Sequence, residues 1–131
     1  MRLDITRKTD LAVRALRVLD ERGERAKSSE LADLISSTAA FVPQVLAPLV
    51  KKGWIRSEPG PAGGYTLVID LDEVAVLDVI EAVEGPTEQE VCVLDGRRCD
   101  EVGHCVIHAA WSRARAELLT ELAATPLIDI G

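Results

Sequence analysis

The N-terminal half of the chain holds three helix-like segments followed by two strand-like runs, and this order restricts the fold more than any other feature. Apolar residues recur at helical spacing from Thr6 to about Glu21, in the octapeptide SSELADLI and again in AAFVPQVLAPLVKKG. The runs WIRSEP and GGYTLVI are joined by GPAG, which is typical of a hairpin. This is the order of a winged helix-turn-helix, although three-helix units also serve as protein-interaction modules.

Helix ends are indicated by capping residues and prolines. Ser28 or Ser29 is expected to cap the short second helix, and Pro43 fits the first turn of the third. Pro48 falls inside the third helix and should bend it or shift its start, and Gly53 should end it. The apolar face of the second helix is predicted to be Leu31, Leu34 and Ile35.

The C-terminal half reads as VAVLDVIEAVEG, a short strand passing into a helix, then a polar loop and a final helix. The predicted fold is mainly α with a small β wing: a winged helix-turn-helix plus a long C-terminal dimerisation helix. Its expected parts are a DNA-binding domain (1–85), a cysteine-rich loop (86–104) and a helix with its tail (105–131), all in one compact unit. One apolar stripe of the last helix comprises Ile107, Trp111, Ala114, Leu118 and Leu122.

Charge is distributed unevenly along the chain. The formal net charge is −7, yet residues 1–64 carry 11 Lys/Arg against 8 Asp/Glu, a net of +3. Such asymmetry indicates one basic working surface on an acidic remainder. No apolar run approaches the ~18 residues of a membrane span, so we expect a cytoplasmic protein without a membrane partner.

The helix-turn-helix supplies the candidate contacts to double-stranded DNA. The third helix can enter the major groove, while basic residues meet phosphate. Lys51 and Lys52 are phosphate candidates, although a solvated helix end also favours positive charge. The predicted DNA-binding residues are Ser37, Thr38, Gln44, Lys51, Lys52, Arg56, Gly63 and Gly64.

All three cysteines lie in one short polar segment, with the spacing C-x6-C-x5-C-x2-H. Zinc knuckles use closer pairs, whereas Cys92, Cys99 and Cys105 can supply the thiolates that hold an iron–sulfur cluster. Zinc and a metal-free thiol switch are the alternatives. His108 follows Cys105 at i,i+3 and is a candidate fourth ligand, and His104 is a weaker one.

Several segments resemble the winged-helix regulator family that includes IscR and NsrR. They are MRL and KTDLAVRAL at the start, LADLI, VLAPLVKKGWI, GPAGGY and VLDVIEAVEG, so the resemblance covers the chain from Met1 to about Leu122. It implies a homodimeric DNA-binding regulator, often a repressor and often a sensor that holds an iron–sulfur cluster. The three cysteines match the cluster-binding cysteines of the family.

The resemblance also supplies candidates for the fourth ligand. His108 resembles the histidine of the IscR arrangement, and Asp10 resembles the carboxylate that NsrR-type proteins contribute from the partner's first helix. Two departures stand out. Many relatives carry an arginine before the first glycine of the wing, where this chain has Glu58-Pro59, and the first cysteine gap is x6 where several relatives have x5.

Together these features predict a transcriptional regulator, and not an enzyme. Twofold symmetry would place two reading helices about one DNA turn apart, which implies a roughly palindromic operator. A 2Fe–2S or 4Fe–4S cluster would sense redox state, nitric oxide or iron–sulfur status. The alternative is a metal- or thiol-dependent interaction protein that has lost specific DNA binding.

Overall fold

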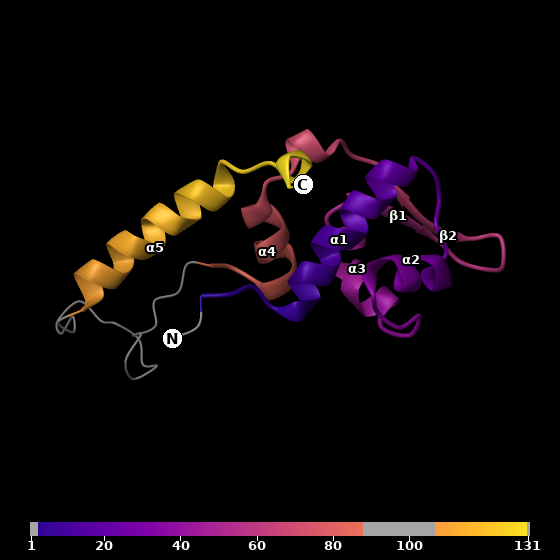
Figure 1. Ribbon diagram of the computed structural model, residues 1–131, viewed down its shortest axis with the longest axis horizontal. Helices are drawn as coiled ribbons and strands as arrows, with labels where there is room; N and C mark the ends of the chain where they lie inside the picture. The colour runs from indigo at the N-terminus through magenta and orange to yellow at the C-terminus, as the bar shows by residue number, and fades with distance from the viewer. Residues whose placement is uncertain (1–2, 88–106, 131) are drawn as a thin grey trace.

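The computed structural model describes residues 3–87 and 107–130, which form a helical body with a hairpin at one end and a long helix at the other (Figure 1). The three cysteines and His104 lie outside these described ranges. In chain order the elements are α1 (Arg7–Arg22), α2 (Ser28–Ile35), α3 (Val42–Lys51), β1 (Ile55–Glu58), β2 (Gly64–Leu67), the 3-10 turn η1 (Leu71–Glu73), α4 (Val76–Glu84), α5 (His108–Ala123) and η2 (Leu127–Asp129).

Helix α1 is the centre of the body and has the ends that its sequence predicts. The Thr6 hydroxyl accepts a hydrogen bond from the Thr9 N–H at 3.2 Å, and Gly23 ends the helix with φ of 68°. Its buried side packs on α2, α3 and α4, which together enclose the main core. Leu11, Leu16 and Leu19 are almost completely buried there.

Helix α2 begins differently from the prediction. Lys27 occupies the N-cap position, so Ser28 and Ser29 lie inside the first turn, and the predicted serine cap is wrong. The Glu30 carboxylate instead accepts the Lys27 N–H at 3.2 Å and pairs with Arg22. The hydrogen bond from the Lys27 N–H, together with Arg22, lowers the pKa of Glu30.

The predicted apolar face of α2 is correct for Leu31 and Ile35 but wrong for Leu34. Leu31 and Ile35 are fully buried, whereas the Leu34 side chain is 53% exposed. The helix has only eight residues and Ala32 is buried beside Leu31, so its buried face is turned away from Leu34.

Helix α3 continues through Pro48 and buries one side completely. Val42, Val45, Leu46 and Leu49 are fully buried at i, i+3, i+4 and i+7. Pro43 stands in the first turn as predicted. Packing of this stripe holds the helix through Pro48, which removes one backbone donor.

Strands β1 and β2 pair antiparallel, from Ile55 opposite Leu67 to Glu58 opposite Gly64. Ala26 adds a short bridge on the other side of β2, exchanging backbone hydrogen bonds with Tyr65. The order of these elements and their packing make a winged helix-turn-helix, as the sequence predicts. The strand expected before α4 is absent from the described residues, because η1 and a single bridge from Ala75 to Pro126 occupy that position.

Helix α5 extends away from the body, whereas the tail after it returns to the body (Figure 1). The Leu127 N–H donates to the Val74 carbonyl at 2.8 Å, and the Leu127 side chain is fully buried in the main core. No residue of α5 itself is buried. Among the described residues, no helix is both long enough and apolar enough to cross a membrane.

Candidate functional site

The side of α3 that faces away from the core forms a small, mostly apolar surface. Gln44 is exposed on the helix and is the only exposed residue of its first two turns with hydrogen-bonding side-chain groups. The other exposed residues of this surface and of the turn before it are Thr38, Ala39, Ala40, Pro43, Ala47 and Lys51. We call these seven residues the reading face.

The turn that leads into α3 is fixed by its own hydrogen bonds. Ser36 ends α2 in the left-handed conformation with φ of 60°, and the Ser37 N–H donates to the Ala32 carbonyl at 2.8 Å. The Thr38 hydroxyl accepts the Phe41 N–H at 3.2 Å. The predicted DNA contacts therefore differ in access: Thr38 is exposed, while Ser37 is half-buried.

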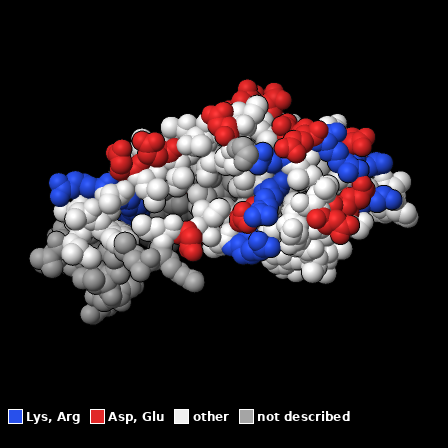
Figure 2. All heavy atoms as spheres, viewed as in Figure 1, with Lys and Arg blue, Asp and Glu red and all other residues white. Residues whose placement is uncertain are grey.

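Lysines and arginines near the reading face differ in their pairing. No carboxylate among the described residues lies within ion-pair distance of Lys51 or Lys52, and both are exposed. Arg56, in contrast, pairs with Glu58 at 3.3 Å. Figure 2 shows positive and negative side chains interspersed on one face of the molecule, without one continuous basic field.

The predicted wing glycines have a clear structural reason. A Cβ on Gly63 would lie 2.0 Å from the Glu58 carbonyl oxygen, and one on Gly64 would lie 2.6 Å from the Ala26 carbonyl oxygen. Both residues therefore allow close backbone approach where β2 follows the loop of the hairpin. Gly63 is buried, and the exposed tip of the wing is residues 59–62.

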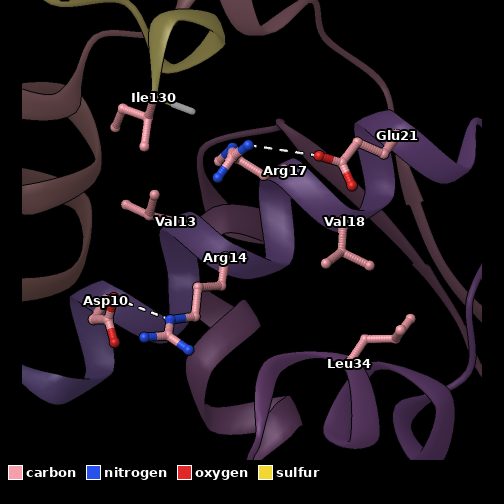
Figure 3. Close-up of a pocket in the computed structure, with 8 residues that line it drawn as sticks. All are labelled: Asp10, Val13, Arg14, Arg17, Val18, Glu21, Leu34 and Ile130. Atoms are coloured by element: carbon pink, nitrogen blue, oxygen red, sulfur yellow. Dashed lines mark hydrogen bonds and ion pairs between the residues drawn. The ribbon is translucent and has the colours of Figure 1, made fainter.

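Asp10, a candidate cluster ligand, lies on the exposed side of α1 between two arginines. Its carboxylate pairs with Arg7 at 3.5 Å and with Arg14 at 3.2 Å. It stands at one end of a hollow of about 410 Å³ between α1, α2 and the C-terminal tail (Figure 3). The lining residues are Asp10, Val13, Arg14, Arg17, Val18, Glu21, Leu34 and Ile130.

His108, the other candidate fourth ligand, is the first residue of α5 and is half-buried. Its predicted i,i+3 partner Cys105 lies outside the described residues, as do Cys92 and Cys99. The described residues therefore place Asp10 and His108 on different helices. Their association with the cysteines stays a prediction.

A link between α1 and α4 was not anticipated from the sequence. The Glu84 carboxylate accepts hydrogen bonds from the Thr9 hydroxyl and, at 3.3 Å each, from the Thr6 N–H and hydroxyl. Thr6 caps α1, and Glu84 is the last residue of α4, just before the cysteine-bearing segment. The partners lie 75 or more positions apart, so no local pattern could reveal them.

Comparisons with known proteins agree on one family. A family model described as Rrf2, an iron-dependent transcriptional regulator, matches residues 5–131. An HTH-type transcriptional regulator of Aquifex aeolicus is 26% identical over 83% of this chain and 77% of its own length. The regulator IscR of Klebsiella pneumoniae strain 342 is 36% identical over 62% of this chain, and the match spans 48% of its length.

Solved structures show the same fold. The global cysteine regulator CymR of B. subtilis superposes with a TM-score of 0.75 at 22% identity, covering 98% of this chain and 96% of that protein. IscR of T. potens superposes with a TM-score of 0.74 at 20% identity, covering 98% of this chain and 85% of that protein.

Proposed function

The chain belongs to the Rrf2 family of transcriptional regulators, and from this premise we propose that it is a homodimeric, DNA-binding repressor controlled by an iron–sulfur cluster. The cluster senses redox state, nitric oxide or iron–sulfur status, and the protein works in the cytoplasm. One observation carries the DNA-binding part of this proposal: the exposed reading face of α3 ends at two lysines that no described carboxylate neutralises.

The chemistry of the reading face suggests what it recognises. The Gln44 amide can donate and accept one hydrogen bond each and so suits the N6/N7 edge of adenine in the major groove. The methyl groups of Ala39, Ala40 and Ala47 suit contact with thymine methyl groups. Half-sites are therefore expected to contain A·T pairs, while Lys51 and Lys52 contact phosphate without reading sequence.

The donor set fits an iron–sulfur cluster. Cys92, Cys99 and Cys105 offer three thiolates within one short segment, and Asp10 or His108 completes the set. When bound, the cluster supplies a group that gains, loses or exchanges ligands and electrons in response to its surroundings. Arg7 and Arg14 already surround the Asp10 carboxylate and would partly offset the negative charge of a thiolate-held cluster.

The Thr6–Thr9–Glu84 link suggests how a change in the cysteine segment reaches the DNA-reading helix. Glu84 ends the helix that precedes this segment, and its carboxylate holds the first turn of α1. Helix α1 packs directly on α2 and α3. A shift at the end of α4 is therefore transmitted to the reading face through elements that are packed together, which is the differential contact that such control requires.

Helix α5 is the proposed dimerisation element. Leu119 and Ala123 line a groove against α4, whereas the predicted stripe containing Leu118 and Ala114 lies on the other side of the helix. Leu118 is 47% exposed. A second copy covering this stripe would give the twofold symmetry that matches a palindromic operator.

The salt dependence of duplex binding tests the proposal. Fluorescence anisotropy with a random-sequence duplex should show affinity that falls steeply with salt. The Lys51→Ala variant should bind all duplexes about threefold more weakly and lower the logarithmic salt slope by about 1 per protomer. Arg113→Ala, an exposed cation on α5, is the matched control and should bind as the parent protein does.

The alternative, an interaction protein without specific DNA binding, has support in the ion-paired arginines of the wing. This alternative predicts weak duplex binding, with the same affinity and the same salt slope for the Lys51→Ala and Arg113→Ala variants. That result would refute the proposed function.

A further inference from the structure

One carboxylate at the end of strand β1 lies between two arginines. Arg56 Nε is 3.3 Å from Glu58 Oε1, and Arg25 Nη1 is 3.7 Å from Glu58 Oε2, so each oxygen faces a different guanidinium group. All three side chains are about half exposed or more. We call Arg25, Arg56 and Glu58 the wing triad.

The backbone of the wing builds this arrangement. Arg56 and Glu58 lie two residues apart on β1 and therefore share one face of the strand. The bridge from Ala26 to Tyr65 brings Arg25 alongside the opposite edge of β2. Arg25 then reaches Glu58 past Gly64, where an added Cβ would lie only 3.0 Å from the Arg25 Cγ.

Stability alone gives little reason for the triad. Exposed ion pairs contribute little to stability, and the hairpin is already fixed by its backbone pairing and its glycines. Guanidinium groups bind carboxylates and phosphates through the same donors and geometry. Two exposed arginines that hold a carboxylate can therefore also hold a DNA phosphate.

We propose that Glu58 is an internal competitor for DNA phosphate that keeps Arg25 and Arg56 from binding the duplex backbone. This inference rests on the proposed DNA-binding function and deepens it. Glu58 weakens sequence-independent attraction to DNA. A phosphate group must either displace the Glu58 carboxylate from the arginines or approach it against the repulsion between two negative charges. Selection of the operator then depends more heavily on the reading face and on Lys52 beside it, because neither Lys51 nor Lys52 has an ion pair among the described residues.

Removing the charge of Glu58 tests the idea. The full-length Glu58→Gln variant, purified anaerobically, is compared with the parent protein by anisotropy on a random-sequence duplex from 50 to 200 mM salt, a range chosen for its strong effect on phosphate contacts. The expected result is about tenfold tighter binding at the lowest salt, with a salt slope steeper by about 1–2 per protomer. Urea unfolding confirms that each variant is folded.

Two controls isolate the triad. Glu73→Gln removes the same charge from an exposed carboxylate that has no ion pair among the described residues, and it should tighten binding far less. In an Arg25→Ala/Arg56→Ala background, Glu58→Gln should have almost no effect, because no guanidinium remains to be released.

The outcomes are distinct. If the parent protein binds with normal salt dependence but Glu58→Gln binds no tighter than Glu73→Gln, or binds more weakly, the competitor role is wrong and the triad is only a structural tie. If neither the parent nor any variant binds duplex in a salt-dependent manner, the proposed function fails and this inference fails with it.

Discussion

Thr9 is the one polar residue that the described part of the chain buries completely, and its hydroxyl donates to the carboxylate of Glu84. A buried hydroxyl needs a partner because its desolvation is otherwise uncompensated. The partner here ends the helix that precedes the cysteine segment. The same hydrogen bond therefore stabilises the body and connects α1 to the end of α4.

Replacing Thr9 by valine should lower the free energy of unfolding by about 1–2 kcal/mol, because Glu84 loses a charge-assisted hydrogen bond while the volume of the side chain is kept. Urea unfolding measures this difference, provided that its m value is unchanged. Thr9→Ser keeps the hydroxyl and should remain closer to the parent protein. Equal stability of the valine variant and the parent would show that the link contributes nothing.

Gln44 is predicted to read one base pair. After an operator is selected from a random duplex library, Gln44→Ala should lose about 1–3 kcal/mol of discrimination at a single A·T position and leave binding to unrelated duplexes unchanged. Anisotropy with operators substituted one base pair at a time locates that position. A uniform loss across all sequences would instead assign Gln44 to backbone contact.

Glu30 gives a pH-dependent contribution at the start of α2. Its pKa is lowered by the Lys27 N–H hydrogen bond and by Arg22, so its stabilising effect is present above the ordinary glutamate pKa and is lost as pH falls through the lowered value. Glu30→Gln should therefore make the free energy of unfolding fall less steeply as the pH is lowered. Urea midpoints of parent and variant between pH 3 and 6 check this, and parallel curves would contradict it.

At the scale of elements, hydrophobic periodicity predicts the helices, whereas tertiary contacts determine the structure of the segments between them. Helix α3 keeps its predicted stripe despite Pro48, because its four fully buried residues pack against α1 and α4. The sequence predicts a strand before α4 where the structure has η1, because β-branched residues there suit either a strand or a buried turn. The bridge from Ala75 to Pro126 is long-range and has no local signal.

The site followed the same division. Thr38, Gln44, Lys51 and Lys52 are exposed, and their contact with DNA stays a prediction. The pairing of Arg56 with Glu58, the approach of Arg25 and the Thr9–Glu84 link depend on chain segments that meet only in the fold. These interactions form because the fold brings distant residues close together, and the spacing of residues along the chain does not predict which of them will meet.

Helix α5 should carry the dimer contact. Leu118→Glu places a charge on the exposed apolar stripe and should convert a dimer into monomers, with a large loss of operator affinity, because a monomer engages only one half-site. Glu117→Lys, which changes the charge of an exposed residue outside this stripe, is the control. Sedimentation equilibrium measures the oligomeric state of each variant. A Leu118→Glu variant that stays dimeric would show that the dimer interface does not include this stripe.

At the scale of the whole molecule, a short packed path joins the helix-turn-helix to α4, the helix that precedes the cysteine segment. The tail after α5 returns to the core through Leu127, so the long helix is tied to the body at its C-terminal end. Its N-terminal end begins at His108, directly after the cysteine segment. The proposed path from the cysteine segment to the reading face runs through α4 and α1.

The most direct test measures iron, acid-labile sulfide and zinc in anaerobically purified protein together with its affinity for a selected operator, before and after removal of iron by a chelator. Control by an iron–sulfur cluster predicts iron and sulfide in equal amounts and a change in operator affinity of about 5- to 150-fold on iron removal. It also predicts that the Cys92→Ala, Cys99→Ala and Cys105→Ala variants bind only as the iron-free protein does. Identical operator affinity with and without iron, or zinc as the only metal, would contradict it.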